Sequence, residues 1–216
     1  MKTWPFRMSA ILSLLVVFGA PAFNTPAYSS GSSCAQLLDQ AIPVFNQAFF
    51  DLRIYRIADC QANVLRLLQS LKAQQTDLKD AQVLYIFRAT ASLDDLDRSS
   101  LIWLHPKSAK LGIGPFAPPW MFHVNLLVGT KILDLDFGHW PSPIDAEEYF
   151  RRMFPQQAEI YVRSVPAEEY LADYLIGIED HDWRKYLFHG EPRYPARRLP
   201  DFLSSQEGAC REAMRF

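Results

Sequence analysis

Hydrophobic residues near the start of the chain recur with the period of a helix. Over residues 34–50, apolar side chains follow one another at intervals that place them on one helical face. A second stripe of the same kind runs over residues 60–73. We therefore predict two helices, the first kinked by Pro43 and the second capped at its N-terminus by Asp59. The stripes consist of Leu38, Ile42, Phe45 and Phe49, and of Cys60, Val64, Leu67, Leu68 and Leu71.

Farther along, runs rich in β-branched and aromatic residues predict strands. Gly129-Thr130 fits the two-residue turn of a hairpin between two of these runs. The long segment 91–119 is predicted as a loop, and the last 30 residues as loop or short helix. Strands are predicted at 82–90, 122–128, 131–137 and 158–165, and helices at 144–154 and 166–175. This order of elements favours an α+β domain.

The first 27 residues have the pattern of a secretory signal. Lys2 and Arg7 precede an uncharged apolar run over residues 8–20. That run is shorter than the roughly 20 residues of a membrane span, and it is followed by small residues and prolines. We expect a signal peptide at 1–27 to be cleaved and a single domain to follow over 28–216. The protein would then be exported, periplasmic or secreted. A retained N-terminal anchor helix is the alternative.

Composition agrees with a packed globular domain. Of the chain, 49% is hydrophobic and 13% is aromatic, enough to bury a sizeable core. Without the first 27 residues, 20 Lys and Arg stand against 24 Asp and Glu, a net charge of −4. This acidic balance disfavours nucleic acid as a partner. Stable membrane insertion is not expected after signal cleavage.

Three cysteines remain in the expected mature chain: Cys34, Cys60 and Cys210. Exported proteins fold in oxidising compartments, where thiols tend to pair. The ends of a domain often lie close together, so a Cys34–Cys210 disulfide that leaves Cys60 free is expected. Three unpaired cysteines are the alternative.

Cys60 would begin the second predicted helix. Unpaired main-chain N–H groups and the helix dipole lower the pKa of a thiol at that place. The charge of the adjacent Asp59 acts against this effect. The other interpretation of Cys60 is a buried, inert cysteine.

The predicted hairpin brings a histidine and two carboxylates onto one face. A two-residue turn pairs Val128 with Lys131, and counting back places His123 opposite Asp136, with Asp134 as a diagonal neighbour. Either carboxylate could then orient the imidazole, as in a nucleophile–base–orienter triad. A solvent-facing polar side of the hairpin is the alternative.

The order of these motifs resembles a known enzyme group. The motifs are Asp59-Cys60-Gln61 opening a helix, Trp120-x-x-His123-Val124, and Asp134-Leu135-Asp136. They resemble those of Cys-His-Asp glutamine amidohydrolases of the transglutaminase-like, papain-related superfamily. Bacterial protein-glutaminases and protein N-terminal glutamine amidohydrolases are the most similar groups. The resemblance implies a papain-like fold, in which a helix bearing the cysteine packs on an antiparallel sheet. It makes Cys60 the nucleophile, His123 the general base and acid, and Asp134 the orienting carboxylate, with Asp136 as the alternative.

The function implied by this resemblance is deamidation. Glutamine side chains of proteins or peptides would become glutamate through a thioester, with no cofactor and no metal. Trp120 would line the substrate-binding slot, or else be an ordinary aromatic residue of the core. A cysteine peptidase or a transglutaminase with the same triad, and a non-catalytic exported binding domain, remain alternatives. The acidic run 179–182 lacks the regular spacing of metal ligands.

Overall fold

The computed structural model describes residues 33–51, 59–88, 120–138, 140–154, 160–175 and 194–206. The expected signal peptide, the predicted loop at 91–119 and Cys210 lie outside these ranges. The described residues form a mixed α+β structure with five helices and a six-stranded antiparallel sheet.

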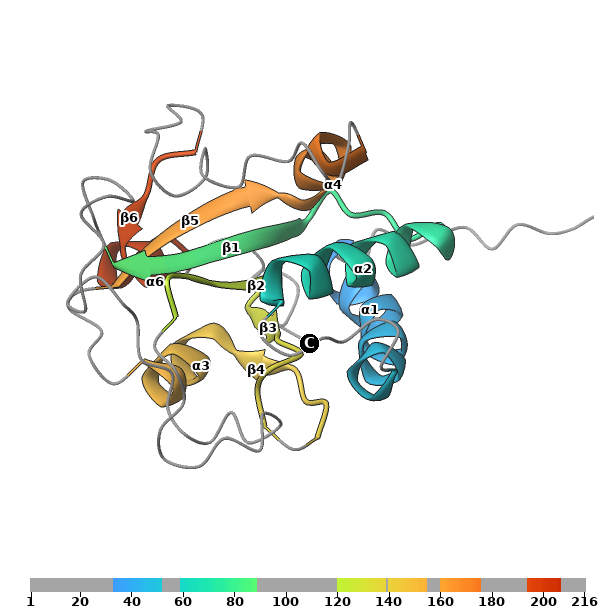
Figure 1. Cartoon of the computed structure of the whole chain (residues 1–216), viewed down its shortest axis with the longest axis horizontal. Helices are drawn as coiled ribbons and strands as arrows, with labels where there is room; N and C mark the ends of the chain where they lie inside the picture. The colour runs from blue at the N-terminus through green and yellow to red at the C-terminus, as the bar shows by residue number, and fades with distance from the viewer. Residues whose placement is uncertain are drawn as a thin grey trace, which may run out of the picture.

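The sheet has the strand order β4-β3-β2-β1-β5-β6. Its central strand β1 pairs with β2 on one side and with β5 on the other, both antiparallel. The long β1 and β5 run side by side in Figure 1, with β6 beyond β5. The strands are β1 (Ala81–Arg88), β2 (His123–Val128), β3 (Lys131–Leu133), β4 (Ile144–Asp145), β5 (Ile160–Pro166) and β6 (Arg197–Arg198).

Helices pack around this sheet at several places. The helices are α1 (Ser33–Phe50), α2 (Cys60–Ala73), α3 (Ala146–Met153), α4 (Ala167–Leu175) and α6 (Leu199–Gln206). α2 contacts both β2 and α1, and α4 contacts β1 and α2. In Figure 1, α1 and α2 lie together on the right, whereas α3 lies at the lower left beside β4. The start of α2 therefore comes next to the strand that carries His123.

The central strands are buried on both faces. Every residue of β2 is buried, and so are six of the eight in β1. Side chains of successive strand residues point to opposite faces, so both faces of the sheet are covered here. Polar residues on β2 are therefore taken out of water and need partners within the protein.

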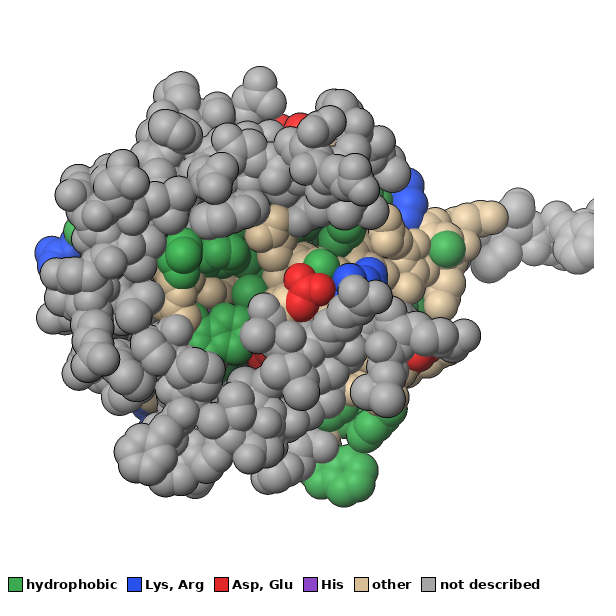
Figure 2. All heavy atoms as spheres, in the orientation of Figure 1, with side chains coloured by type: hydrophobic (Ala, Val, Ile, Leu, Met, Phe, Trp, Pro, Cys, Tyr) green, Lys and Arg blue, Asp and Glu red, His purple; other side chains and the backbone are tan. Residues whose placement is uncertain are grey.

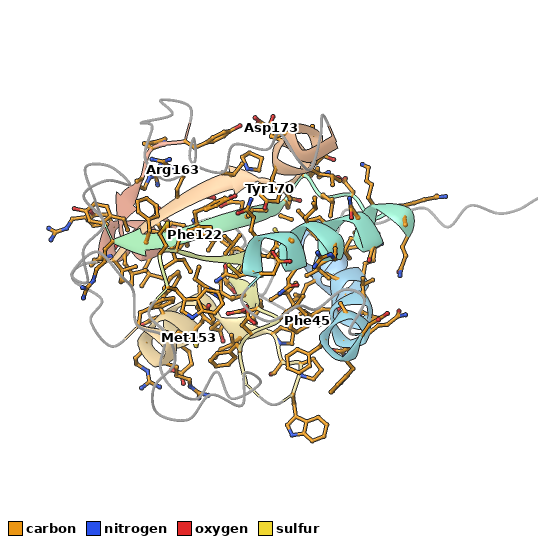
Figure 3. The ribbon with its side chains drawn as sticks, in the orientation of Figure 1. Phe45, Phe122, Met153, Arg163, Tyr170 and Asp173 are labelled. Carbon is orange, nitrogen blue, oxygen red and sulfur yellow. The ribbon has the colours of Figure 1, made fainter. Side chains whose placement is uncertain are left out.

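Tyr170 links α4 to α2 within this core (Figure 3). Its side chain is fully buried, and its hydroxyl donates a hydrogen bond to the main-chain oxygen of Gln61 at 3.3 Å. Its ring contacts Tyr85 of β1, with the ring centroids 6.2 Å apart. The helix that begins with Cys60 is thus held to the sheet by apolar packing and by this hydrogen bond.

Several predicted elements are confirmed. The two predicted N-terminal helices form as α1 and α2, and Pro43 lies inside a continuous α1. Gly129 has a φ of 62°, a conformation that favours glycine, at the tight turn between β2 and β3. The predicted strands at 82–90 and 158–165 form as β1 and β5, and the predicted helix at 166–175 as α4.

Other boundaries are wrong. The predicted strand at 131–137 ends at Leu133, and the predicted helix at 144–154 begins only at Ala146, after the two residues of β4. Asp59 precedes α2 as predicted, but its side chain makes no capping hydrogen bond. That carboxylate instead bonds Arg66 at 3.3 Å, and the main-chain oxygen of Asp59 accepts from Asn63 N–H.

None of the described helices combines the length and the apolar character that crossing a membrane requires.

Replacing Leu68 by Ala should test the packing of α2. The Leu68 side chain is fully buried in the core cluster. Removing its buried atoms should lower the free energy of unfolding by about 2–5 kcal/mol, measured by urea denaturation. Gln69→Ala, at an exposed position of the same helix, is the matched control and should change little. Equal effects of the two substitutions would contradict the packing described.

Candidate active site

Cys60 is the first residue of α2 and its thiol faces β2. The residue is 5% exposed and is a free cysteine. The thiol interacts with the imidazole of His123, and the main-chain N–H of Val124 lowers the pKa of the thiol. The structure therefore brings the predicted nucleophile and the predicted base together, although 62 positions separate them along the chain.

His123 begins β2 and is fully buried. Its Nε2 lies 2.8 Å from Asp134 Oδ2. The other ring nitrogen, Nδ1, is buried and has no hydrogen bond of normal geometry within the described residues. Because Nε2 is engaged, Nδ1 is the nitrogen left for the interaction with Cys60. Hydrogen bonds between catalytic groups are often long until substrate binds, so this arrangement suits a nucleophile–base pair.

Asp134 is held by three donors. Its Oδ2 accepts from His123 Nε2 and, at 2.6 Å, from the hydroxyl of Tyr149. Its Oδ1 accepts from the main-chain N–H of Asp136 at 2.8 Å. A carboxylate with this many short hydrogen bonds has a fixed orientation and remains ionised. It can therefore set the tautomer and the direction of the imidazole.

The local fold explains why Asp134 and not Asp136 meets the histidine. The pairing of β2 with β3 follows the predicted register from Val128↔Lys131 to Leu126↔Leu133 and then stops. Beyond Leu133 the chain turns, with Phe137 N–H donating to the main-chain oxygen of Asp134 at 3.3 Å. The sequence count that placed Asp136 directly opposite His123 is therefore wrong.

Asp136 nevertheless lies close to the site. It is 1% exposed, and its charge acts on the thiol of Cys60. His123, Asp134 and Asp136 each offer one ligand atom within 4.8 Å of the others, a spacing that could hold a metal ion. A metal bound there would have to replace the hydrogen bond between His123 and Asp134. The acidic run at 179–182 lies outside the described residues.

Burial and the paired charges set the protonation of the site. Burial lowers the pKa of His123, but the charge and the hydrogen bond of Asp134, together with the interaction with Cys60, raise that pKa well above its usual value. Burial raises the pKa of Asp134, but His123 and the hydrogen bonds bring it below its usual value. The resting pair is therefore imidazolium and carboxylate.

The thiol behaves differently from the expectation based on its helix position. Burial raises the pKa of Cys60, and the interaction with His123 lowers it by less. The charge of Asp136 raises it by a smaller amount, and the main-chain N–H of Val124 lowers it slightly. The net pKa is raised, so the expected lowering by the helix N-terminus is wrong. With His123 already charged, the thiol and the imidazolium must together lose one proton before the thiol can pass its own proton to the imidazole.

Trp120 packs edge-on against the imidazole of His123. The ring centroids are 5.4 Å apart and the planes are nearly perpendicular. The indole is 8% exposed, and its N–H has no hydrogen-bond partner among the described residues. Trp120 thus helps to fix the ring of His123, and its role in a substrate slot stays a prediction.

Tyr149 was missed by the sequence reasoning. The signal for it was a tyrosine on the buried stripe of an amphipathic helix, because a buried hydroxyl needs a hydrogen-bond partner. Asn125 of β2 is also fully buried, and its amide lowers the pKa of the Tyr149 hydroxyl.

Cys34 is disulfide-bonded and Cys60 is not. The expected partner, Cys210, lies outside the described residues, so that pairing stays a prediction.

The surface drawn in Figure 2 agrees with the burial of the site. No described histidine is visible on this face, in line with the full burial of His123.

No protein-family model matches the chain, and a search of curated proteins finds no significant match. The assignment of the site therefore depends on its geometry.

Replacing His123 by Gln should destabilise the protein most at acid pH. Because the pKa of His123 is raised in the folded protein, the imidazolium stabilises the fold fully below pH 6.5. This stabilisation is lost as the pH rises through the pKa that His123 has in the folded state. Leaving Asp134 buried and unpaired should cost about 3–5 kcal/mol near pH 6 and less near pH 9. Urea denaturation of Cys60→Ser with and without His123→Gln isolates this effect from the thiol. A difference that grows with pH would contradict the imidazolium–carboxylate pair.

Proposed function

We propose that the protein is a cofactor-independent cysteine amidohydrolase that deamidates glutamine side chains of proteins or peptides. The observation that carries this proposal is the buried chain of contacts from the thiol of Cys60 through His123 to Asp134. The choice of glutamine rests on the resemblance of the motifs to glutamine amidohydrolases. A papain-like fold belongs to the same proposal, supported by the packing of α2 on β2.

The reaction begins from the form of the Cys60–His123 pair that has one proton fewer than the resting form, so that the imidazole is neutral and can accept a proton. His123 takes the thiol proton as the sulfur of Cys60 attacks the side-chain amide carbon of glutamine. The negative charge that develops on the amide oxygen is stabilised by main-chain N–H groups at the start of α2. His123 then gives the proton to the departing nitrogen, which leaves as ammonia. The product of this half is a thioester between Cys60 and the substrate.

The second half is hydrolysis. His123 removes a proton from water, and the resulting hydroxide attacks the thioester carbon. The carbon–sulfur bond breaks, the proton returns to the sulfur, and glutamate is released. Asp134 stays ionised throughout, orienting the imidazole and stabilising its charged form.

The protonation of the site predicts an alkaline preference. At rest Cys60 is a thiol and His123 is an imidazolium, and the reactive form of these two groups has one proton fewer. The rate should therefore rise as pH increases through the first deprotonation of the pair.

The same triad could serve neighbouring reactions. A cysteine peptidase would cleave the main chain, and a transglutaminase would pass the acyl group to an amine instead of water. A non-catalytic binding domain with the same fold would release neither ammonia nor peptide fragments. Export through the N-terminal signal, to the periplasm or beyond the cell, is part of the same proposal.

Ammonia release should depend on Cys60. With casein as substrate, the protein should release ammonia without producing new amino termini or cross-links. Cys60→Ala should lower the rate by about 10³-fold or more, since it removes the nucleophile. Gln69→Ala, on the exposed side of the same helix, should keep the full rate.

Each other product pattern has a definite meaning. New amino termini would identify a peptidase, and cross-linked casein a transglutaminase. Ammonia release that survives Cys60→Ala would overturn the proposal.

The two carboxylates should differ when each is replaced by its amide. Asp134→Asn removes the acceptor of His123 Nε2 and should lower kcat by about 10³–10⁴-fold. Asp136→Asn removes a charge that raises the pKa of Cys60, so the rising limb of the pH–rate profile should move to lower pH. Ammonia assays across a pH series measure both effects. A larger loss of kcat in Asp136→Asn would give the orienting role to Asp136.

A further inference from the structure

Tyr149 is a second side chain that donates a hydrogen bond to the carboxylate of Asp134. It belongs to α3 and is fully buried. Its hydroxyl donates to Asp134 Oδ2 at 2.6 Å, and the same oxygen lies 2.8 Å from His123 Nε2. Two donors from different elements thus share one carboxylate oxygen, and the hydrogen bonds form a chain from phenol to imidazole.

The phenol is held firmly in this place. Its ring contacts Phe137 in the turn after Asp134, with centroids 5.5 Å apart, and Phe150 and Phe154 at the end of α3. The turn that carries Asp134 and the helix that carries Tyr149 are therefore packed against each other. A buried phenol fixed in this way loses little entropy when it donates its hydrogen bond.

The hydroxyl remains a donor over the working pH range. Burial raises the pKa of Tyr149, and the charge of Asp134 raises it further, well above its usual value. A phenol has one proton to donate, and here it goes to Asp134.

We propose that Tyr149 is a positioning residue that sets how strongly Asp134 holds the proton of His123. A second donor on Oδ2 draws negative charge away from the bond to the imidazole and prevents the carboxylate from rotating. Without it, Asp134 would attract the imidazolium proton more strongly and would be less well oriented. The catalytic consequence rests on the proposed function, whereas the effect on His123 does not.

The experiment is a double-mutant cycle read on the imidazole. Tyr149→Phe keeps the packed ring and removes only the hydroxyl. In NMR titrations of the full chain, it should shift the pKa of His123 upward. In an Asp134→Asn background the same substitution should leave His123 unchanged, because the acceptor that transmits the effect is gone. If Tyr149 acted only through the packing of its ring, Tyr149→Phe would have the same effect on the pKa of His123 in both backgrounds.

A matched control and a kinetic readout complete the test. Tyr170→Phe also removes a buried tyrosine hydroxyl, one that bonds the main-chain oxygen of Gln61, and should not shift His123. In the ammonia assay, Tyr149→Phe should lower kcat by about 10–100-fold with little change in KM, since a hydrogen bond to a charged group is lost.

The outcomes separate the two proposals. An unchanged His123 pKa in Tyr149→Phe, or an equal shift in Tyr170→Phe, would overturn the role of Tyr149 and leave the proposed function standing. The expected shift in a protein that releases no ammonia would support the role of Tyr149 and count against the function.

Discussion

A charged imidazole inside a protein depends on a carboxylate beside it, and the pair of His123 and Asp134 is that interaction here. Both side chains are removed from water, where an unpaired charge would be costly. Their contact at 2.8 Å, with the additional hydrogen bonds to Asp134, makes the buried charges tolerable. The thiol of Cys60 lies beside an imidazole whose position is already fixed by Asp134.

The fold supplies the site from the ends of its elements. Cys60 is the first residue of α2, His123 the first of β2, and Asp134 the first residue after β3. Each side chain thus lies at the end of a regular element, and the packing of α2 on β2 brings two of these ends together. Because the covered sheet keeps water away from the pair, burial raises the pKa of the thiol. The same environment that orients the groups therefore makes the loss of the thiol proton depend on His123.

Sequence patterns predicted the periodic parts of this structure and missed the parts without a period. The hydrophobic stripes of α1 and α2 and the tight turn at Gly129 could be predicted from the sequence. They correctly place Cys60 on α2 and His123 on β2. The end of β3 could not be predicted from the sequence, because the alternation of Leu and Asp continues past Leu133 while the chain turns. Tyr149 depends on how α3 packs, and the direction of the Cys60 pKa depends on burial, neither of which sequence spacing determines. The family resemblance chose Asp134, which the hydrogen bond to His123 supports.

Detecting the thioester on Cys60 is the most direct test of whether Cys60 is the nucleophile. The protein is mixed with a glutamine-containing peptide, quenched in acid within the first turnover, and examined by intact-mass and peptide-mapping mass spectrometry. We expect an adduct on Cys60 equal in mass to the peptide less one ammonia, which disappears as glutamate forms. Ammonia release with no adduct on Cys60, or with the adduct on another residue, would contradict the role of Cys60 as the nucleophile.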